Sequence, residues 1–294
     1  GAGILSTRAA AALPIVIPEG KAITLDLNGC TVTVPYENES DKKHYYAFEN
    51  HGSLTIKDSK GDGEIIARGN FNYGTMTLES GIINACDGNG GYGVRNYEGA
   101  EFIMNGGSII TSLEDGDIPG AGYDACPVRV DEGATATING GVIDNVSNFT
   151  CDIDNYGTTI INDGTFTSIH TTIANKASMT INGGSFTCNG LEGITAHALW
   201  AAAGTTTING GTFDGKDNYN GFNVNSTEDA VVNIYGGNFL NAHSGSLYGN
   251  GTINVMGGFY FDDPTARVVT GYRTIEINPT LYTVMKGSVE NGVD

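Results

Sequence analysis

One short phrase recurs eight times along the 294-residue chain, and it constrains the fold more than any other feature. The phrase consists of an apolar residue, two mostly polar or small residues, a glycine, any residue, and an apolar or aromatic residue. Its clear copies read LESGII, MNGGSI, INGGVI, INDGTF, INGGSF, INGGTF, IYGGNF and VMGGFY, around Gly81, Gly107, Gly141, Gly164, Gly184, Gly211, Gly237 and Gly258. Copies spaced about 20 to 34 residues apart indicate a solenoid, in which each repeat packs only on its neighbours.

The chemistry of the phrase predicts a corner between two short strands. Apolar side chains on either side of it, such as Ile181 and Phe186, are expected to point inward. The glycine between them can adopt a positive φ without steric cost, so the chain can turn there. A second corner is predicted about six residues earlier, at recurring asparagines. Asparagine tolerates the left-handed conformation, and its amide can stack on an equivalent amide one coil away. These asparagines are Asn50, Asn72, Asn155 and Asn175.

Two corners and three short strands per repeat describe one triangular coil. Stacked coils pair their strands in parallel about 4.8 Å apart and bury columns of apolar side chains. The sequence therefore predicts an all-β protein, a right-handed single-stranded parallel β-helix of about ten coils. The 44 glycines fit the many tight turns of such a solenoid. A leucine-rich repeat is excluded because its leucine and asparagine spacing is absent, and a β-sandwich would need no fixed phrase.

Both ends are expected to carry caps, which keep terminal coils from pairing with other chains. Residues 6–13, STRAAAAL, predict a short helical lid with Ser6 as its N-cap and Pro14 as its stop. The repeat ends after Gly258, and residues 272–284 predict the strands of a β cap. The chain is therefore divided into an N-terminal cap at residues 1–20, a parallel β-helix at 21–262 and a C-terminal cap at 263–294.

Charge and composition narrow the classes of partner. The formal net charge of −19 argues against nucleic acid and anionic membranes, because no basic patch exists to release phosphate counterions. No stretch reaches the roughly eighteen apolar residues that a membrane span requires. The five cysteines form no CxxC pair, which removes the usual zinc and redox patterns. The first residues lack a leader pattern, so we expect that a leader, if one existed, has been removed.

Three motifs carry a resemblance to a known family. They are the repeated ING-G-[ST]-F phrase, KAITLDLNG at residues 21–29 and LTIKDSKGDG at residues 54–63. They resemble those of pectin-lyase-like β-helix proteins, and more narrowly the repeat proteins of bacterial surfaces and of phage particles. The segment DPTARVVTGY at residues 263–272 is similar to the way such repeats close. The resemblance implies the fold, but its members include lyases, hydrolases, adhesins and virion fibres, so it does not imply one activity.

The catalytic patterns that the resemblance implies are largely missing. Lyases of this kind place calcium-binding carboxylates beside an Arg or Lys base, and galacturonan hydrolases carry Asn-Thr-Asp, Asp-Asp, Gly-His-Gly and Arg-x-Lys motifs. Only an Asp262–Asp263 pair appears, beside the predicted C-terminal cap, so no catalytic residue is assigned. Alignment of the repeats predicts an exterior ladder of Arg95, Arg129 and Asp154, for which a charge ladder between stacked coils is the simpler interpretation.

An acidic loop is the most distinctive surface feature. The longest interval between phrases contains SLEDGDIPGAGYDACP, with four carboxylates that could hold calcium through oxygen ligands. An ordinary solvated loop is the alternative, and no other cofactor is expected. The candidate calcium ligands are Glu114, Asp115, Asp117 and Asp124. The segment at residues 58–63 superficially resembles a calcium loop, but Lys60 replaces a ligand there, so it predicts a turn.

Two cysteines are expected to be neighbours on adjacent coils. Cys126 and Cys151 each lie two residues before the aligned residues Val128 and Ile153. Adjacent coils would bring their Cα atoms about 5 Å apart, within the range of a disulfide. A bridged pair and a stacked pair of reduced thiols fit the sequence equally well.

Regular coils, missing catalytic motifs and an acidic exterior favour a non-catalytic structural or attachment module. We expect a rigid rod that acts outside the cell, on a bacterial surface or a phage particle, with a cell-surface glycan or another structural protein as its partner. A polysaccharide lyase or glycoside hydrolase is the alternative. Oligomerisation cannot be read from the sequence. Aromatic residues that could form a glycan-facing surface, with inward packing as the alternative for about half of the set, are Tyr92, Tyr97, Tyr123, Trp200, Tyr219 and Phe222.

Overall fold

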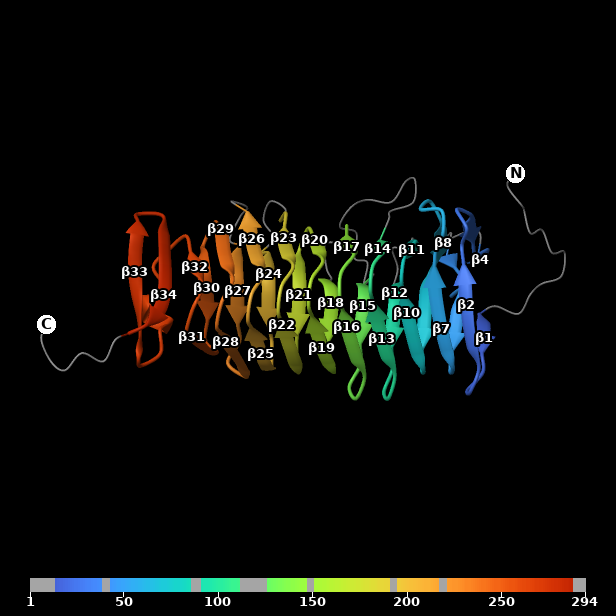
Figure 1. Ribbon diagram of the computed structural model, residues 1–294, viewed down its shortest axis with the longest axis horizontal. Coiled ribbons are helices and arrows are strands. Elements are labelled where there is room, and N and C mark those ends of the chain that lie inside the picture. The colour runs from blue at the N-terminus through green and yellow to red at the C-terminus, as the bar shows by residue number, and fades with distance from the viewer. Residues whose placement is uncertain are drawn as a thin grey trace, which may run out of the picture.

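The protein is a right-handed parallel β-helix whose coils stack along one axis (Figure 1). The computed structural model describes residues 14–38, 43–85, 91–111, 126–146, 151–190, 195–216 and 221–287. Each coil contributes one strand to each of three sheets, called A, B and C, so the strands of a sheet follow one another in chain order up to the C-terminal hairpin. The predicted fold class is therefore confirmed.

The strands are short throughout the stack. Sheet A contains β1 (Ile15–Ile17), β6 (Phe48–Asn50), β9 (Gly69–Asn72), β12 (Tyr92–Asn96), β15 (Cys126–Val130), β18 (Cys151–Asn155), β21 (Thr171–Asn175), β24 (His197–Ala201), β27 (Phe222–Ser226) and β30 (Gly245–Gly249). Sheet B contains β2 (Ala22–Asp26), β7 (Ser53–Lys57), β10 (Thr75–Leu78), β13 (Glu101–Met104), β16 (Thr135–Ile138), β19 (Thr158–Ile161), β22 (Ser178–Ile181), β25 (Gly204–Ile208), β28 (Ala230–Ile234) and β31 (Thr252–Val255).

Sheet C completes each coil and also holds the C-terminal hairpin. It contains β3 (Thr31–Thr33), β8 (Glu64–Ala67), β11 (Ile82–Ala85), β14 (Ser108–Thr111), β17 (Val142–Asn145), β20 (Thr165–Ser168), β23 (Ser185–Cys188), β26 (Thr212–Lys216), β29 (Asn238–Ala242), β32 (Phe259–Tyr260), β34 (Leu281–Lys286) and β33 (Tyr272–Asn278). Outside these sheets lie a hairpin of β4 (Tyr36–Asn38) and β5 (Lys43–His44) and one 3-10 turn, Thr265–Arg267.

The recurring phrase forms the corner between sheets B and C, as predicted. All eight of its anchor glycines have a positive φ, for example 101° at Gly184. A Cβ atom at Gly184 would come within 3.1 Å of the carbonyl oxygen of Gly164, its counterpart one coil earlier. Glycine is therefore required at this corner both by the backbone conformation and by the close approach of neighbouring coils.

Inward side chains from all three sheets form one continuous core. The aromatic residue that ends many copies of the phrase is fully buried on sheet C, where neighbouring coils stack their rings 4.7–5.0 Å apart. This interior stack consists of Phe166, Phe186, Phe213, Phe239 and Tyr260. The prediction that Ile181 and Phe186 point inward is confirmed, because neither side chain is exposed.

The predicted asparagine stacking is also confirmed, but the predicted left-handed backbone is wrong. The Asn50 side chain donates to that of Asn72 at 2.7 Å, and Asn155 donates to Asn175 at 2.7 Å. These residues end the strands of sheet A in an ordinary backbone conformation. Among the described non-glycine residues, only Asn28, Lys216 and Asn241 have a positive φ. Asparagine therefore serves here as an inward amide that links coils, and not as a residue that bends the chain.

The C-terminal end of sheet C is closed by the β33–β34 hairpin (Figure 1). Strand β34 pairs antiparallel with β32, and β33 pairs antiparallel with β34. The predicted strands of a β cap are therefore present. The helical lid predicted at residues 6–13 lies outside the described residues, which contain no α-helix. No helix in the described part of the chain has the length and apolar character needed to cross a membrane.

The connections between sheets differ strongly in length. Turns from sheet A to B and from B to C are short, and the longest of them spans residues 58–63. Connections from sheet C to sheet A range from the single residue Arg68 to residues 112–125. The segments whose length varies from coil to coil therefore all directly precede strands of sheet A.

Candidate functional site

The outer surface of sheet A carries two rows of outward side chains, which we call the sheet A face. In β18, for example, Ile153 and Asn155 are buried, whereas Asp154 between them points outward. The strand row contains Phe71, Arg95, Arg129, Asp154, Ala174, Trp200, Asn225 and Tyr248 in register. The turn row follows the last residue of each strand and contains His51, Tyr73, Tyr97, Asp131, Tyr156 and Lys176. The predicted ladder of Arg95, Arg129 and Asp154 is confirmed by this register.

A chain of ion pairs joins the middle coils of this face. Asp131 accepts hydrogen bonds from Nε of Arg95 at 2.9 Å and from Nε of Arg129 at 2.8 Å. Asp154 in turn accepts from Nη1 of Arg129 and from Nζ of Lys176, both at 2.8 Å. Each carboxylate thus bridges two cations, which holds all five side chains in one arrangement.

These contacts shift the pKa values of the basic groups. Burial by itself lowers the pKa of the Arg129 guanidinium. The hydrogen bond to Asp131 and the charge of Asp154 outweigh burial, so the net pKa of Arg129 is raised. The pKa of Lys176 is likewise raised, because its hydrogen bonds to Asp154 and Tyr156 outweigh burial. Both groups therefore stay charged at neutral pH, and neither is arranged to release a proton.

Aromatic rings lie among these charges. The Arg129 guanidinium carbon and the Lys176 Nζ lie 4.1 and 4.2 Å from the ring centre of Tyr156. Arg95 lies 4.7 Å from the ring centre of Tyr97. Tyr97 also stacks on Tyr73 with a centroid separation of 4.3 Å. Such cation–π contacts fix the rings in place and leave part of their surfaces at the solvent.

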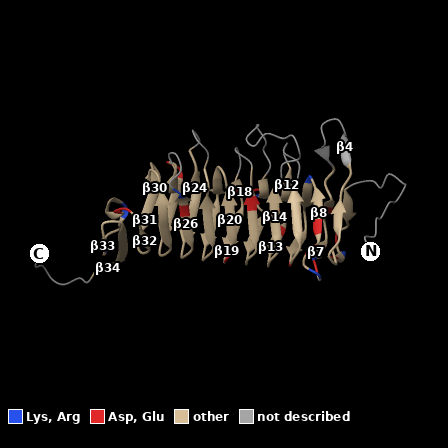
Figure 2. Ribbon diagram, turned by 90° about the horizontal axis from the view of Figure 1, so that it is seen from above, with Lys and Arg blue, Asp and Glu red and all other residues tan. Residues whose placement is uncertain are grey.

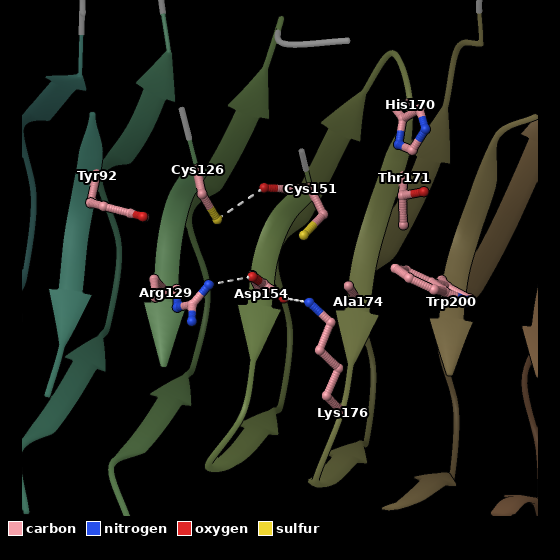
Figure 3. A pocket seen from close by; sticks show the side chains of 10 residues that line it. All are labelled: Tyr92, Cys126, Arg129, Cys151, Asp154, His170, Thr171, Ala174, Lys176 and Trp200. Carbon is pink, nitrogen blue, oxygen red and sulfur yellow. Dashed lines mark hydrogen bonds and ion pairs between the residues drawn. The ribbon is translucent and has the colours of Figure 1, made fainter. Parts of the chain in front are cut away.

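A hollow of about 320 Å³ opens on the sheet A face between β12 and β24 (Figure 3). It exists because Cys151, Thr171 and Ala174 are small, whereas Tyr92 and Trp200 stand on the strands at either end. Its lining residues are Tyr92, Cys126, Arg129, Cys151, Asp154, His170, Thr171, Ala174, Lys176 and Trp200.

The two thiols in the hollow resolve an alternative that the sequence left open. Cys126 and Cys151 are buried, free cysteines on adjacent strands. The Cys126 thiol donates to the backbone carbonyl of Cys151 at 3.2 Å. The hydrogen bond with Cys126 and burial both raise the pKa of the Cys151 thiol well above its ordinary value. The pair is therefore a stacked pair of free thiols and not a disulfide.

Several polar groups in and beside the hollow have no hydrogen-bond partner within the described residues. The hydroxyl of Thr171 belongs to a residue that is 2% exposed, and it is unpaired. Nδ1 of His170, which also lines the hollow, is unpaired too. Burial lowers the pKa of His170, so its imidazole is neutral at pH 7. Neutral polar side chains therefore lie opposite the ion pairs, and their unpaired atoms are shielded from solvent.

The aromatic residues singled out from the sequence fall into two groups. Tyr92 and Trp200 line the hollow, Tyr97 lies in the turn row, and Phe222 stacks on Tyr248 with a centroid separation of 4.1 Å. All four contribute to the same side of sheet A. The remaining candidates, Tyr123 and Tyr219, lie outside the described residues.

Sequence reasoning missed Tyr73, Tyr156 and Lys176. A signal was present, because each directly follows an asparagine of the inward row and must therefore point outward. His170 and Thr171 carried no comparable signal, since their part in the hollow depends on the small side chains around them.

No metal site is found among the described residues, which contain no suitable group of three or more His, Cys, Asp or Glu side chains. The candidate calcium ligands Glu114, Asp115, Asp117 and Asp124 lie outside the described residues, so that site stays a prediction. The segment at residues 58–63 is a turn, as predicted. The Asp58 carboxylate accepts from the backbone amides of Gly29 at 2.6 Å and Gly63 at 2.7 Å.

The sheet A face differs in charge from the chain as a whole. Acidic residues outnumber basic ones 33 to 14 in the sequence, and most positions on the stacked strands carry no charge (Figure 2). The ion-paired chain on the sheet A face, by contrast, holds Arg95, Arg129 and Lys176 against Asp131 and Asp154. This part of the surface is therefore slightly cationic within an acidic protein.

Comparison with known proteins identifies no relative: no family model, no curated protein and no solved structure matches the chain.

Proposed function

We propose that this protein is a non-catalytic attachment module, a rigid rod that acts outside the cell and binds a glycan along the sheet A face. The observation that carries the proposal is the concentration of aromatic rings and ion-paired side chains on one side of sheet A, spread over successive coils. The resemblance to bacterial surface and phage repeat proteins supports the same function.

The chemistry of this face suits a carbohydrate. The C–H faces of a pyranose ring are apolar and pack on aromatic rings, and its hydroxyls need donors and acceptors at fixed positions. Tyr97 and Trp200 offer ring surface, and the Asp131–Arg129–Asp154 chain offers fixed polar groups. Because the backbone beneath them is a stacked sheet, little conformational entropy is lost when a ligand binds.

A purely structural role for these contacts explains the exposed aromatic rings less well than glycan binding does. Ion pairs at the surface contribute only about 0–1 kcal/mol to stability, so they do not by themselves account for exposed rings beside them. The three buried thiols, Cys126, Cys151 and Cys188, are compatible with a location outside the cell because burial shields them from oxidants.

A lyase or hydrolase is the alternative, and the hollow supports it poorly. Glycoside hydrolysis uses a pair of carboxyl groups, one as acid and one as base or nucleophile. Asp154 is the one carboxylate among the residues that line the hollow, and it is held between Arg129 and Lys176.

The proposal is tested by screening the protein against a broad glycan panel and measuring the affinity for the best ligand by calorimetry. We expect Trp200→Ala to weaken binding at least about tenfold, because truncating a central aromatic contact usually costs more than 1.4 kcal/mol. Tyr235→Ala is the matched control, since Tyr235 is 53% exposed at the corner between sheets B and C, away from the face.

Two outcomes would contradict the proposal. One is the absence of binding across the panel, and the other is equal affinity of the wild type and Trp200→Ala. Release of reducing ends from a glycan that the protein binds would favour the enzyme alternative.

A further inference from the structure

We propose that the hollow between β12 and β24 is a subsite for one oxyanion of the glycan, a carboxylate or a sulfate ester, and that the sheet A face therefore prefers acidic glycans to neutral ones. This inference rests on the proposed function and specifies the chemistry of its ligand. A volume of about 320 Å³ lies at the lower end of the usual range for small-molecule pockets. The hollow therefore suits a single charged sugar unit and leaves the rest of a polymer to the neighbouring coils.

The charges in the lining of the hollow do not balance. Two cations, Arg129 and Lys176, face one carboxylate, Asp154, and the lining contains no other Arg, Lys, Asp or Glu within the described residues. Arg95 and Asp131 extend the ion-paired chain by one charge of each sign, so the excess of one positive charge is unchanged. An anionic group on the ligand would cancel this excess, whereas a neutral ligand would displace water from it without compensation.

Arg129 keeps a hydrogen-bond donor that the protein does not use. A guanidinium has five N–H groups. Arg129 donates through Nε to Asp131 and through Nη1 to Asp154, and its Nη2 has no partner within the described residues. The side chain is 24% exposed, and Nη2 is not shielded from solvent, unlike the unpaired atoms of Thr171 and His170. An oxyanion in the hollow can therefore accept a charge-assisted hydrogen bond from Arg129.

Lys176 supplies a second donor beside an aromatic wall. Its Nζ donates to Asp154 and to the hydroxyl of Tyr156, which leaves one of its three N–H groups free. The side chain is 24% exposed, and Nζ lies 5.8 Å from the ring centre of Trp200. The indole of Trp200 extends toward Ala174 (Figure 3). A pyranose ring packed on this indole would bring an anionic substituent within reach of Nζ, so the same site recognises the ring and its charge.

Other ionisable groups near the hollow leave this excess unchanged. Burial lowers the pKa of His170, which is therefore neutral at pH 7. Asp152 lies inward beside Cys151, and burial favours its protonated form. The net charge of −19 repels an acidic ligand at a distance. Charges more than about 8 Å away are largely screened at physiological ionic strength, so the lining of the hollow decides the affinity.

The test uses calorimetry on pairs of ligands that differ mainly in charge. One pair is a galacturonate tetramer and its fully methyl-esterified form, and the other is a sulfated galactose tetramer and its unsulfated form. We expect at least one acidic ligand to bind at least about tenfold more tightly than its neutral partner, as a charge-assisted hydrogen bond predicts. The first pair reports on a carboxylate and the second on a sulfate ester. Equal or weaker binding of both acidic ligands would overturn the inference.

The variant Lys176→Met tests whether the preference arises in the hollow, because methionine is an unbranched side chain without a charge. It should weaken acidic binding at least about tenfold and leave neutral binding within about twofold, and Lys176→Arg should restore the preference. Lys57→Met is the matched control, since Lys57 is an exposed residue at the end of β7 in sheet B, and it should change neither affinity. Full acidic affinity in Lys176→Met, or equal weakening of both ligands, would contradict the proposed subsite.

A failure of this inference can be told apart from a failure of the proposed function. If acidic and neutral ligands bind equally and Trp200→Ala weakens both, the sheet A face binds glycan but does not select its charge. If no glycan of the panel binds to the wild type, the proposed function itself fails.

Discussion

At the scale of single residues, Asp152 is the most unusual group in the molecule. It follows Cys151 in β18, its side chain is fully buried, and neither carboxylate oxygen has a hydrogen-bond partner within the described residues. Burial raises the pKa of this carboxyl group well above its ordinary value, and the nearby charge of Asp144 adds to the rise. The nearby backbone of Thr167, which does not meet hydrogen-bond geometry with either oxygen, offsets only part of it. Burial therefore favours the protonated form of Asp152 in the folded protein.

The direction of its effect on stability follows from that rise. Below the pKa of an unfolded aspartate, about 3.9, both states carry the proton and the group has no effect on pH dependence. Above it, the unfolded chain ionises while the folded chain does not, which favours unfolding. The contribution of Asp152 to the free energy of unfolding therefore falls as pH rises from about 4 toward the raised pKa.

The variant Asp152→Asn should remove this fall in the free energy of unfolding at higher pH. Asparagine is neutral at every pH, and Asn223 occupies the same register position three coils later. We expect Asp152→Asn to raise the free energy of unfolding at pH 7 by about 1–3 kcal/mol and to have little effect at pH 4. Urea unfolding at the two pH values measures both quantities. A variant that is less stable than the wild type at pH 7 would show that the Asp152 carboxylate has a stabilising role.

Asp58 provides a control of opposite sign. Hydrogen bonds from the backbone amides of Gly63 and Gly29 lower the pKa of Asp58. A carboxylate of this kind stabilises the fold above its unfolded pKa, and the effect is lost as pH falls through the folded pKa. Asp58→Asn should therefore reduce the stability at pH 7 and not increase it.

Asp152 also marks a limit of sequence reasoning at this scale. Strict alternation along β18 would place Asp152 and Asp154 on the same, outer side of the sheet. The structure buries Asp152 and leaves Asp154 outward, because the first residues of the strand still belong to the corner with sheet C. Alternation predicts side-chain direction in the middle of a strand, and it fails where the chain is still turning.

At the scale of elements, two ladders of asparagine side chains connect successive coils. The inward ladder ends the strands of sheet A and includes Asn155 and Asn175. The second ladder is exposed at the corner between sheets B and C, where each side chain donates to the one before it at 2.7–2.8 Å. Its members are Asn105, Asn139, Asn162, Asn182 and Asn209. The two ladders have similar donor–acceptor distances, but they donate in opposite directions along the stack and differ in burial.

This difference predicts unequal costs of substitution. Asn155 donates to the Asn175 side chain at 2.7 Å and to the backbone carbonyl of Ser178 at 2.9 Å, and it accepts from Thr159 at 2.8 Å. Asn155→Ala leaves these buried partners unpaired and should cost about 2–4 kcal/mol. Asn162→Ala breaks bonds of the same length, but water replaces them at the surface, so its cost should stay below about 1 kcal/mol. Thermal and urea unfolding of the pair measure the difference, and equal costs would show that burial does not determine the value of a ladder.

The inward ladder was predictable, because its asparagines recur at one position of the repeat. The exposed ladder lies within the phrase itself, at the asparagine of ING. The linking role of this asparagine was not predicted from the sequence, because the neighbouring glycine was sufficient to explain the corner. The sheet A face was predictable only in part: repeat alignment placed Arg95, Arg129 and Asp154 in one row. The hollow beside them depends on three adjacent small side chains, and no single position reveals it.

At the scale of the whole molecule, the fold could be predicted because every coil repeats the same local pattern. The structural signal in one copy of the repeat is weak, but in a solenoid many copies predict the same local structure. The ends follow no repeat and were harder to predict. At the C-terminal end, the β33–β34 hairpin covers sheet C through the pairing of β34 with β32. Tyr260 of β32 is fully buried there.

Removal of the hairpin should therefore change how the protein associates. A chain that ends at residue 269 exposes Tyr260 and leaves the edge of β32 without its partner strand. Unpaired strand edges bind other edges. We expect the truncated protein to form larger species than the full chain at equal concentration, as measured by size-exclusion chromatography with light scattering. Identical masses and unfolding midpoints for the two proteins would show that the hairpin does not cap the stack.

The alternation of inward and outward residues on sheet A has a consequence for how this molecule can diversify. Inward positions carry the columns that every coil must share, whereas outward positions touch neither the core nor the pairing of strands. Mutations in the outward rows can therefore accumulate one coil at a time while the chain continues to fold. The same property makes the protein a scaffold for directed evolution. A library limited to the outward residues of β15, β18, β21 and β24 would vary ligand recognition, and every variant would keep the same fold.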